Sequence, residues 1–165
     1  MLKELLGEEK YLNVKESDNI LYKALEISSI IFKHDVDKGG LPYSIHMLYV
    51  YRHVDTIEEK VVALLHDIME EKNITEEELL DIGFSKKIVD DIKILTRVKP
   101  SEYNDYIDDI VKNGSKEALT VKLADVKHNM DMSRIKNPTV KDYERVEKRY
   151  APAYTKILNR LEEIK

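Results

Sequence analysis

Residues 61–71, VVALLHDIMEE, place an adjacent histidine and aspartate, His66 and Asp67, in an apolar run, and two glutamates, Glu70 and Glu71, follow one helical turn later. Apolar residues on almost every side indicate a buried helix. A buried carboxylate without a partner costs several kcal/mol or shifts its pKa. A divalent cation compensates, because it binds neutral imidazole and carboxylate oxygen together. The stretch therefore predicts part of a metal site.

Further ligands must come from elsewhere, because adjacent helical residues point about 100° apart and the pair supplies at most two. His46 lies in PYSIH, after a glycine-rich turn, and Asp125 lies in the mostly apolar VKLADVKHNMD, with Asn129 one turn further on the same face. Two histidines and two aspartates suit Mn²⁺, Fe²⁺, Co²⁺ or Zn²⁺ better than Ca²⁺. Such a set leaves coordination positions for water and a substrate oxygen.

Glu70 is three residues from Asp67 and four from His66, so on a continuous helix it shares their face and could accept a proton from a water at the site. Structural interpretations compete with this one. A histidine–aspartate dipeptide alone is more often a polar pair in a core, and two glutamates before Lys72 would also suit a solvated helix end. His34, His53 and His128 are predicted to be structural rather than ligands.

Helical periodicity and capping signals predict an all-α fold of about eight helices, and no stretch shows strand-like alternation. Helices are expected over about 18–32, 43–52 and 56–71, and a last helix with a kink near Pro152 runs to the C-terminus. The expected caps are Thr56, Thr75, Ser85, Ser101, Ser115 and Thr139.

Composition bounds the class of protein. The chain has 165 residues and fits one domain, 1–165, in which 136–165 is a helical extension packed on the rest. It has no cysteine, which excludes disulfides and thiol chemistry. No apolar run approaches the ~20 residues of a membrane span, and the charged N-terminus does not suit a signal peptide, so we expect a soluble cytoplasmic protein. The formal charge of −5 argues against nucleic-acid binding.

The order His46, His66-Asp67, Asp125 resembles the H…HD…D signature of the HD-domain phosphohydrolases. The segments GGLPYSIH, ALLHDIMEE and VKLADVKHNMD are similar, in order and spacing, to the hydrolase domain of the RelA/SpoT alarmone enzymes and their small single-domain relatives. The similarity covers roughly residues 18–135. It implies a compact HD-domain helical bundle.

The resemblance also implies roles for individual residues. One divalent ion, usually Mn²⁺, would be held by His46, His66, Asp67 and Asp125. Glu70 and Glu71 match the acidic pair that orients or activates water, and Asn129 matches an asparagine that helps to position the substrate or a ligand.

Substrate contacts are predicted from position alone. Lys38 and Arg134 are basic residues near the motifs, and Tyr103 is a candidate for lining the pocket. Alarmone hydrolases commonly carry Arg-Lys before PYxxH, and that arginine helps to hold the guanine. Here the segment is HDVDKGG, in which Lys38 is kept but Asp37 stands near the arginine's place, and an aspartate does not stack on a base as a guanidinium does.

The expected function is therefore a metal-dependent phosphohydrolase acting on a nucleotide, with a (p)ppGpp 3′-pyrophosphohydrolase as the leading hypothesis. The alternative enzyme is a nucleoside 5′-monophosphatase or another nucleotide pyrophosphohydrolase. A non-catalytic module that senses nucleotide is the alternative of another class. The expected partner is a small nucleotide, without nucleic acid or membrane, and the long C-terminal helix is a candidate homodimer contact.

Overall fold

Helices form all of the regular secondary structure in the computed structural model, which describes residues 1–165. The α-helices are α1 Leu2–Leu6, α2 Glu8–Glu16, α3 Ile20–Ile31, α4 Tyr43–Arg52, α5 Ile57–Leu65, α6 Ile68–Lys72, α7 Glu76–Asp81, α8 Lys86–Ile94, α9 Tyr103–Asn113, α10 Lys116–Met130, α11 Val140–Arg145 and α12 Ala151–Glu163. A 3₁₀ turn, η1 Met132–Arg134, and a π turn, η2 Val146–Tyr150, complete the set. The all-α prediction is confirmed. The predicted count of about eight is low, since the N-terminal segment adds two short helices and two predicted helices are divided, one between α5 and α6 and the other at η2.

Side-chain caps set most of the helix starts. The Thr56 hydroxyl accepts a hydrogen bond from the Glu59 N–H, and the Glu59 carboxylate accepts one from the Thr56 N–H, which is a capping box. The caps predicted at Thr75, Ser85 and Ser115 are also present. Thr139 precedes α11 as predicted, but its N–H and its hydroxyl both donate to the Asp142 carboxylate. The cap predicted at Ser101 is wrong, because α9 begins after Glu102 and has no side-chain cap.

The helix predicted over 56–71 is broken at the histidine–aspartate pair. His66 ends α5, and Asp67, with φ −101° and ψ 1°, precedes α6. On a continuous helix the two side chains would point about 100° apart. The break is a correction to the predicted helix, and it lets both side chains reach one place.

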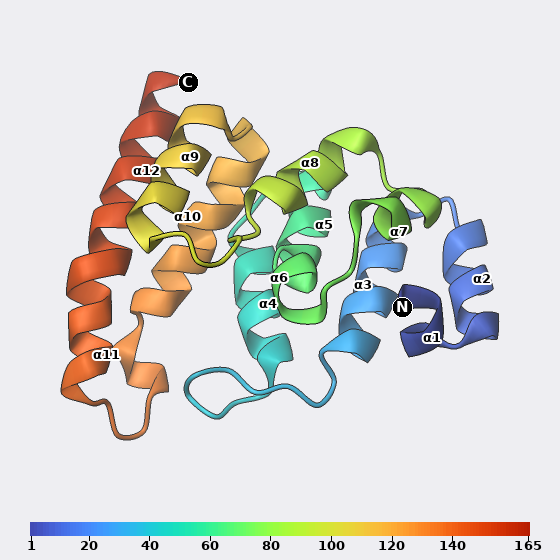
Figure 1. Cartoon of the computed structure of the whole chain (residues 1–165), viewed down its shortest axis with the longest axis horizontal. Coiled ribbons are helices and arrows are strands. Elements are labelled where there is room, and N and C mark those ends of the chain that lie inside the picture. Colours follow the sequence, from blue (N-terminus) through green and yellow to red (C-terminus); the bar gives the residue numbers. More distant parts are fainter.

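Two helices, α5 and α10, lie among the other helices of the fold (Figure 1). In α5 the five residues from Val61 to Leu65 are all buried, as the apolar run predicted. Helix α10 packs against α4, α5 and α12, and buries both apolar and charged side chains. The buried apolar residues form one cluster that extends from Leu2 to Leu161. Charged groups on α5 and α10 therefore lie inside the packed helices.

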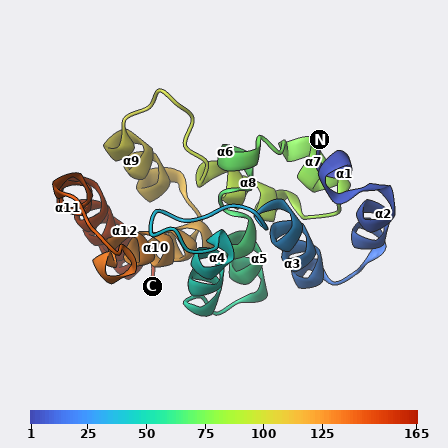
Figure 2. The same ribbon diagram turned by 90° about the horizontal axis from the view of Figure 1, so that it is seen from below.

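The loop from α3 to α4 and the C-terminal helices flank this centre. The loop extends toward α11 before it returns to α4 (Figure 2). Helices α11, η2 and α12 follow one another without a break in helical backbone. Pro152 lacks the N–H that would bond to the Lys148 carbonyl, which accounts for the irregular turn near the expected kink. No helix in the chain combines the length and the apolar character that crossing a membrane requires.

Candidate metal centre

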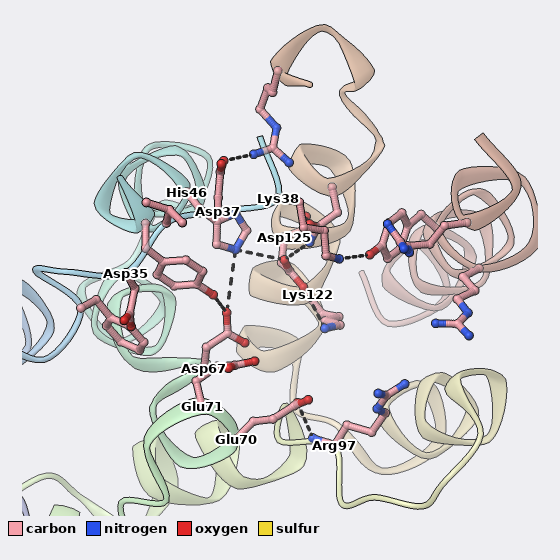
Figure 3. A pocket seen from close by; sticks show the side chains of 18 of the residues that line it. Asp35, Asp37, Lys38, His46, Asp67, Glu70, Glu71, Arg97, Lys122 and Asp125 are labelled. Atoms are coloured by element: carbon pink, nitrogen blue, oxygen red, sulfur yellow. Dashed lines mark hydrogen bonds and ion pairs between the residues drawn. The ribbon is translucent and has the colours of Figure 1, made fainter. Parts of the chain in front are cut away.

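Three separate parts of the fold bring the predicted ligands together. His46 comes from α4, His66 and Asp67 from the break between α5 and α6, and Asp125 from the middle of α10. These elements pack against one another, so the side chains meet at the base of a cavity (Figure 3). His46, His66 and Asp125 are 4%, 2% and 5% exposed.

The distances between ligand atoms suit a single ion. His46 Nε2 lies 3.3 Å from Asp125 Oδ1, 3.4 Å from His66 Nε2 and 3.9 Å from Asp67 Oδ2. Asp67 Oδ2 lies 3.0 Å from His66 Nε2. Two ligands that are each ~2.1 Å from an ion are ~3.0 Å apart at a right angle and ~3.4 Å apart in a tetrahedron. His46, His66 and Asp125 therefore form a buried group that can hold a metal ion. Asp67, the fourth predicted ligand, lies outside this group and approaches it only through the two histidines.

The charges of this group depend on one another. Burial lowers the pKa of His66, but Asp67 and Asp125 outweigh burial and raise that pKa to about 9. Burial raises the pKa of Asp67, but His66 outweighs it and holds the carboxyl pKa well below its usual range. Burial also raises the pKa of Asp125, but the charge of Lys122 outweighs burial, so the pKa of Asp125 lies below its usual range. The site thus keeps two carboxylates ionised inside the fold.

Two further side chains fix the carboxylates. The Tyr43 hydroxyl donates a hydrogen bond to Asp67 Oδ2, and Lys122 Nζ lies 2.8 Å from Asp125 Oδ2. Burial raises the pKa of Tyr43 far above its ordinary value, so the phenol remains a donor. Sequence reasoning missed Tyr43, although it lies in the PYSIH segment. Lys122 lies three residues before Asp125 in the VKLADVKHNMD segment.

The second nitrogens of the two histidines have different partners. His66 Nδ1 lies 2.8 Å from the carbonyl oxygen of Ala63. His46 Nδ1 lies 2.7 Å from Nδ1 of His128, which is buried. Burial and the neighbouring His46 lower the pKa of His128 to about 4. His128 is not placed among the ligands, but it contacts one of them, which its sequence position gave no means to predict.

Asn129 lies against a ligand. Its Nδ2 donates to Asp125 Oδ1 at 2.5 Å and to the Asp125 carbonyl at 3.1 Å, and the side chain also lines the cavity. The spacing of one helical turn predicted this shared face. Asn129 therefore orients Asp125 in this structure.

Glu70 and Glu71 both line the cavity but point differently (Figure 3). The Glu70 carboxylate accepts a hydrogen bond from the Arg97 N–H at 3.1 Å, while Glu71 lies beside Asp67. Burial, Asp67 and Glu70 raise the pKa of Glu71. Because the helix is broken before α6, the two glutamates are not the simple continuation of the His66 face that the sequence predicted.

The predicted substrate contacts line the same cavity. Lys38 Nζ lies 2.5 Å from the Tyr150 hydroxyl, and the Tyr103 ring meets the Tyr150 ring edge-on. Arg134 is paired with Asp37. The other two histidines outside the ligand set, His34 and His53, are exposed.

Asp37 is fully engaged within the protein. Its Oδ1 accepts hydrogen bonds from the N–H groups of Gly39 and Leu41, and its Oδ2 pairs with Arg134. A Cβ on Gly39 would lie 2.5 Å from the Arg134 carbonyl oxygen, so the loop and η1 approach closely there. Asp37 therefore fastens the loop instead of offering a free carboxylate to a base.

The cavity above the centre has a volume of about 750 Å³. Seven basic and six acidic side chains line it, an excess of positive charge in a chain of formal charge −5. The basic ones are Lys38, Lys72, Arg97, Lys122, Arg134, Arg145 and Arg149. Arg145, Arg149 and Tyr150 belong to the C-terminal extension, whose part in the site the sequence motifs did not indicate.

The chain matches no protein-family model, and a search of curated proteins finds no relative with significant similarity.

Proposed function

We propose that this protein is a metal-dependent phosphohydrolase of the HD-domain type that acts on a nucleotide. One observation carries the proposal: His46, His66 and Asp125 form a buried group of potential ligands beside a cavity rich in basic side chains, and Asp67 Oδ2 lies 3.0 Å from His66 Nε2 and 3.9 Å from His46 Nε2. This donor set with two glutamates beside it is the equipment that hydrolysis of a phosphate ester requires.

His46, His66, Asp67 and Asp125 would hold one divalent ion, with Mn²⁺ first and Fe²⁺, Co²⁺ or Zn²⁺ also compatible with these ligands. Such an ion, when bound, lowers the pKa of water and screens the negative charge of a phosphate. Tyr43, Lys122 and Asn129 keep the carboxylates in place by hydrogen bonds. The ligands are then held before substrate enters.

The glutamates would take separate tasks. Glu71, which lines the cavity beside Asp67, accepts the proton of the attacking water on its carboxylate, and its raised pKa brings it closer to neutrality, where a general base is most effective. Glu70 holds the backbone of Arg97. Arg97 and Arg149 line the cavity, and neither forms an ion pair, so their guanidinium groups are available to phosphate oxygens.

The leading substrate is a guanosine 3′-pyrophosphate alarmone. The cavity is large enough for a nucleotide, and the half-buried ring of Tyr103, which lines it, offers aromatic surface for a base. A nucleoside 5′-monophosphatase or another nucleotide pyrophosphohydrolase is the alternative enzyme. A module that binds nucleotide without cleaving it is the alternative of another class.

A substrate panel tests the proposal. Protein loaded with Mn²⁺ is incubated with guanosine tetraphosphate, deoxynucleoside monophosphates and nucleoside triphosphates, and released pyrophosphate and orthophosphate are measured separately. We expect pyrophosphate from the tetraphosphate. Orthophosphate from monophosphates would replace the alarmone with the alternative enzyme, and tight nucleotide binding without any product would favour the sensing module. The Asp125→Asn variant is the control, since it should lose both ion and products.

A further inference from the structure

His128 lies behind His46, on the side opposite the ligand cluster. His46 uses its two ring nitrogens in two directions: Nε2 faces Asp125 Oδ1 at 3.3 Å, and Nδ1 faces His128 Nδ1 at 2.7 Å. No other partner contacts His46 Nδ1. His128 is 2% exposed, so its contact with His46 is shielded from water. The contact is therefore a direct bond between two buried imidazoles.

The proton in this bond has two arrangements. A neutral imidazole has one N–H and one lone pair, so of two nitrogens 2.7 Å apart one donates and the other accepts. A histidine binds a metal through the nitrogen that carries no proton. If His46 binds through Nε2, its proton lies on Nδ1, and His128 Nδ1 must be the acceptor.

We propose that His128 is a positioning residue that holds His46 in the Nδ1–H tautomer, with the Nε2 lone pair directed at the metal. The proposal rests on the metal centre of the proposed function. A second histidine in this role differs from the usual carboxylate or carbonyl acceptor, which cannot donate in return. His66 has that usual arrangement, since its Nδ1 faces the carbonyl of Ala63 at 2.8 Å.

Packing fixes the ring of His128 for this role. The Tyr49 ring stacks on it with a centroid distance of 4.2 Å and an interplanar angle of 27°. The His46 ring lies at 4.9 Å and 26°. With Tyr49 packed on its face and His46 at its edge, the imidazole of His128 keeps Nδ1 directed at His46, while its own proton is on Nε2.

Two substitutions separate this role from simple packing. His128→Phe keeps an aromatic ring against Tyr49 but removes the acceptor, whereas His128→Asn loses the ring but keeps an acceptor, because Oδ1 is bonded to Cγ as Nδ1 is. Mn²⁺ and Zn²⁺ affinities are measured by titration calorimetry. We expect His128→Phe to weaken both by roughly 10- to 100-fold, as loss of an outer partner does, and His128→Asn to restore most of the affinity. The reverse order would show that only the ring matters and would overturn the proposal.

Nitrogen NMR on the unaltered chain gives a test that does not depend on the stability of variants. In ¹⁵N-histidine-labelled protein loaded with diamagnetic Zn²⁺, His46 should carry its proton on Nδ1 and His128 on Nε2. A proton on His128 Nδ1 overturns the proposal. If the unaltered chain binds neither ion, the proposed metal centre is wrong, and this inference is wrong with it. If the unaltered chain and His128→Phe bind both ions with equal affinity, only the role of His128 is wrong.

Discussion

Neighbouring residues of the same type have different surroundings at this site. Glu71 lies beside Asp67 with a raised pKa, and Glu70 is engaged by the Arg97 N–H. Lys122 and Asp125 form a buried ion pair, whereas most lysines in proteins are exposed to water. The chemistry assigned to each residue therefore follows from its contacts and not from its type.

Replacement of the two glutamates should have unequal effects. Glu71→Gln removes the proposed proton acceptor and is expected to lower kcat by about 10²- to 10⁴-fold with Mn²⁺ affinity unchanged. Glu70→Gln can still accept the Arg97 N–H and should keep most of the activity, whereas Glu70→Ala should raise KM. Steady-state kinetics on the substrate found in the panel measure these effects. Equal loss of kcat in Glu70→Gln and Glu71→Gln would return the base role to Glu70.

Lys122→Met should destabilise the metal-free protein. It leaves the buried Asp125 carboxylate without its cationic partner, and loss of one member of a buried pair costs roughly 3–5 kcal/mol. Because an ion takes over the balancing of Asp125, Mn²⁺ should restore more stability to the variant than to the parent. Thermal unfolding with and without Mn²⁺ measures both the loss of stability and its recovery by the ion. The exposed Lys116→Met is the control, and an equal rise in Tm in variant and parent would contradict this account.

Two helix ends, the break between α5 and α6 and the N-terminus of α10, position side chains at and near the site. The break between α5 and α6 gives the site two adjacent ligands, and the N-terminus of α10 is fixed by Ser115, whose hydroxyl donates to the buried Asp91 of α8. Burial raises the pKa of Asp91 even though Ser115 and Lys87 oppose it. The junction of α8 and α10 therefore includes a carboxyl group that is costly to ionise.

The pH dependence of stability should report on this junction. The folded-state pKa of Asp91 lies above its unfolded value of about 3.9, so the folded chain binds the proton more tightly, and ionisation destabilises it as pH rises through that window. Asp91→Asn keeps an acceptor for Ser115 but does not ionise. Urea unfolding from pH 3 to pH 7 should show the variant gaining stability relative to the parent. A difference in unfolding free energy that stays constant with pH would show that burial does not disfavour the ionised form of Asp91.

At the scale of the molecule, the loop after α3 and the C-terminal extension both contribute to the wall of the cavity. The loop after α3 is fastened by Asp37 to Arg134 and by Lys38 to Tyr150, so it joins the central helices to the C-terminal extension. Arg149 and Tyr150 come from the π turn, and such turns occur often at functional sites. The extension therefore forms part of the site in addition to packing on the core.

Arg149→Gln tests the contribution of the extension. We expect KM for a phosphorylated substrate to rise about tenfold, with a smaller change in kcat, because one guanidinium contact to phosphate is lost far from the ligands. Arg160→Gln, on the same helical segment but outside the cavity, is the matched control. Kinetics at two ionic strengths measure the effect, which salt should reduce. Equal KM values in the two variants would remove Arg149 from the binding surface.

The sequence by itself determined what depends on local chemistry. Side-chain spacing and caps such as Thr56 predicted the helices, because they act within a few residues, and the apolar run around His66 indicated burial. The type of each ligand, imidazole or carboxylate, restricts the metals that suit it.

Tertiary structure alone decided what the ligands touch. His128 behind His46, the Tyr43 hydroxyl on Asp67 and the cavity wall at Arg149 all join segments that are distant along the chain. Local periodicity also missed the break at Asp67, which separates two helices that a continuous pattern would join. The physical reason is that such contacts arise from how helices pack against one another, and the spacing of residues within one helix does not specify its neighbours.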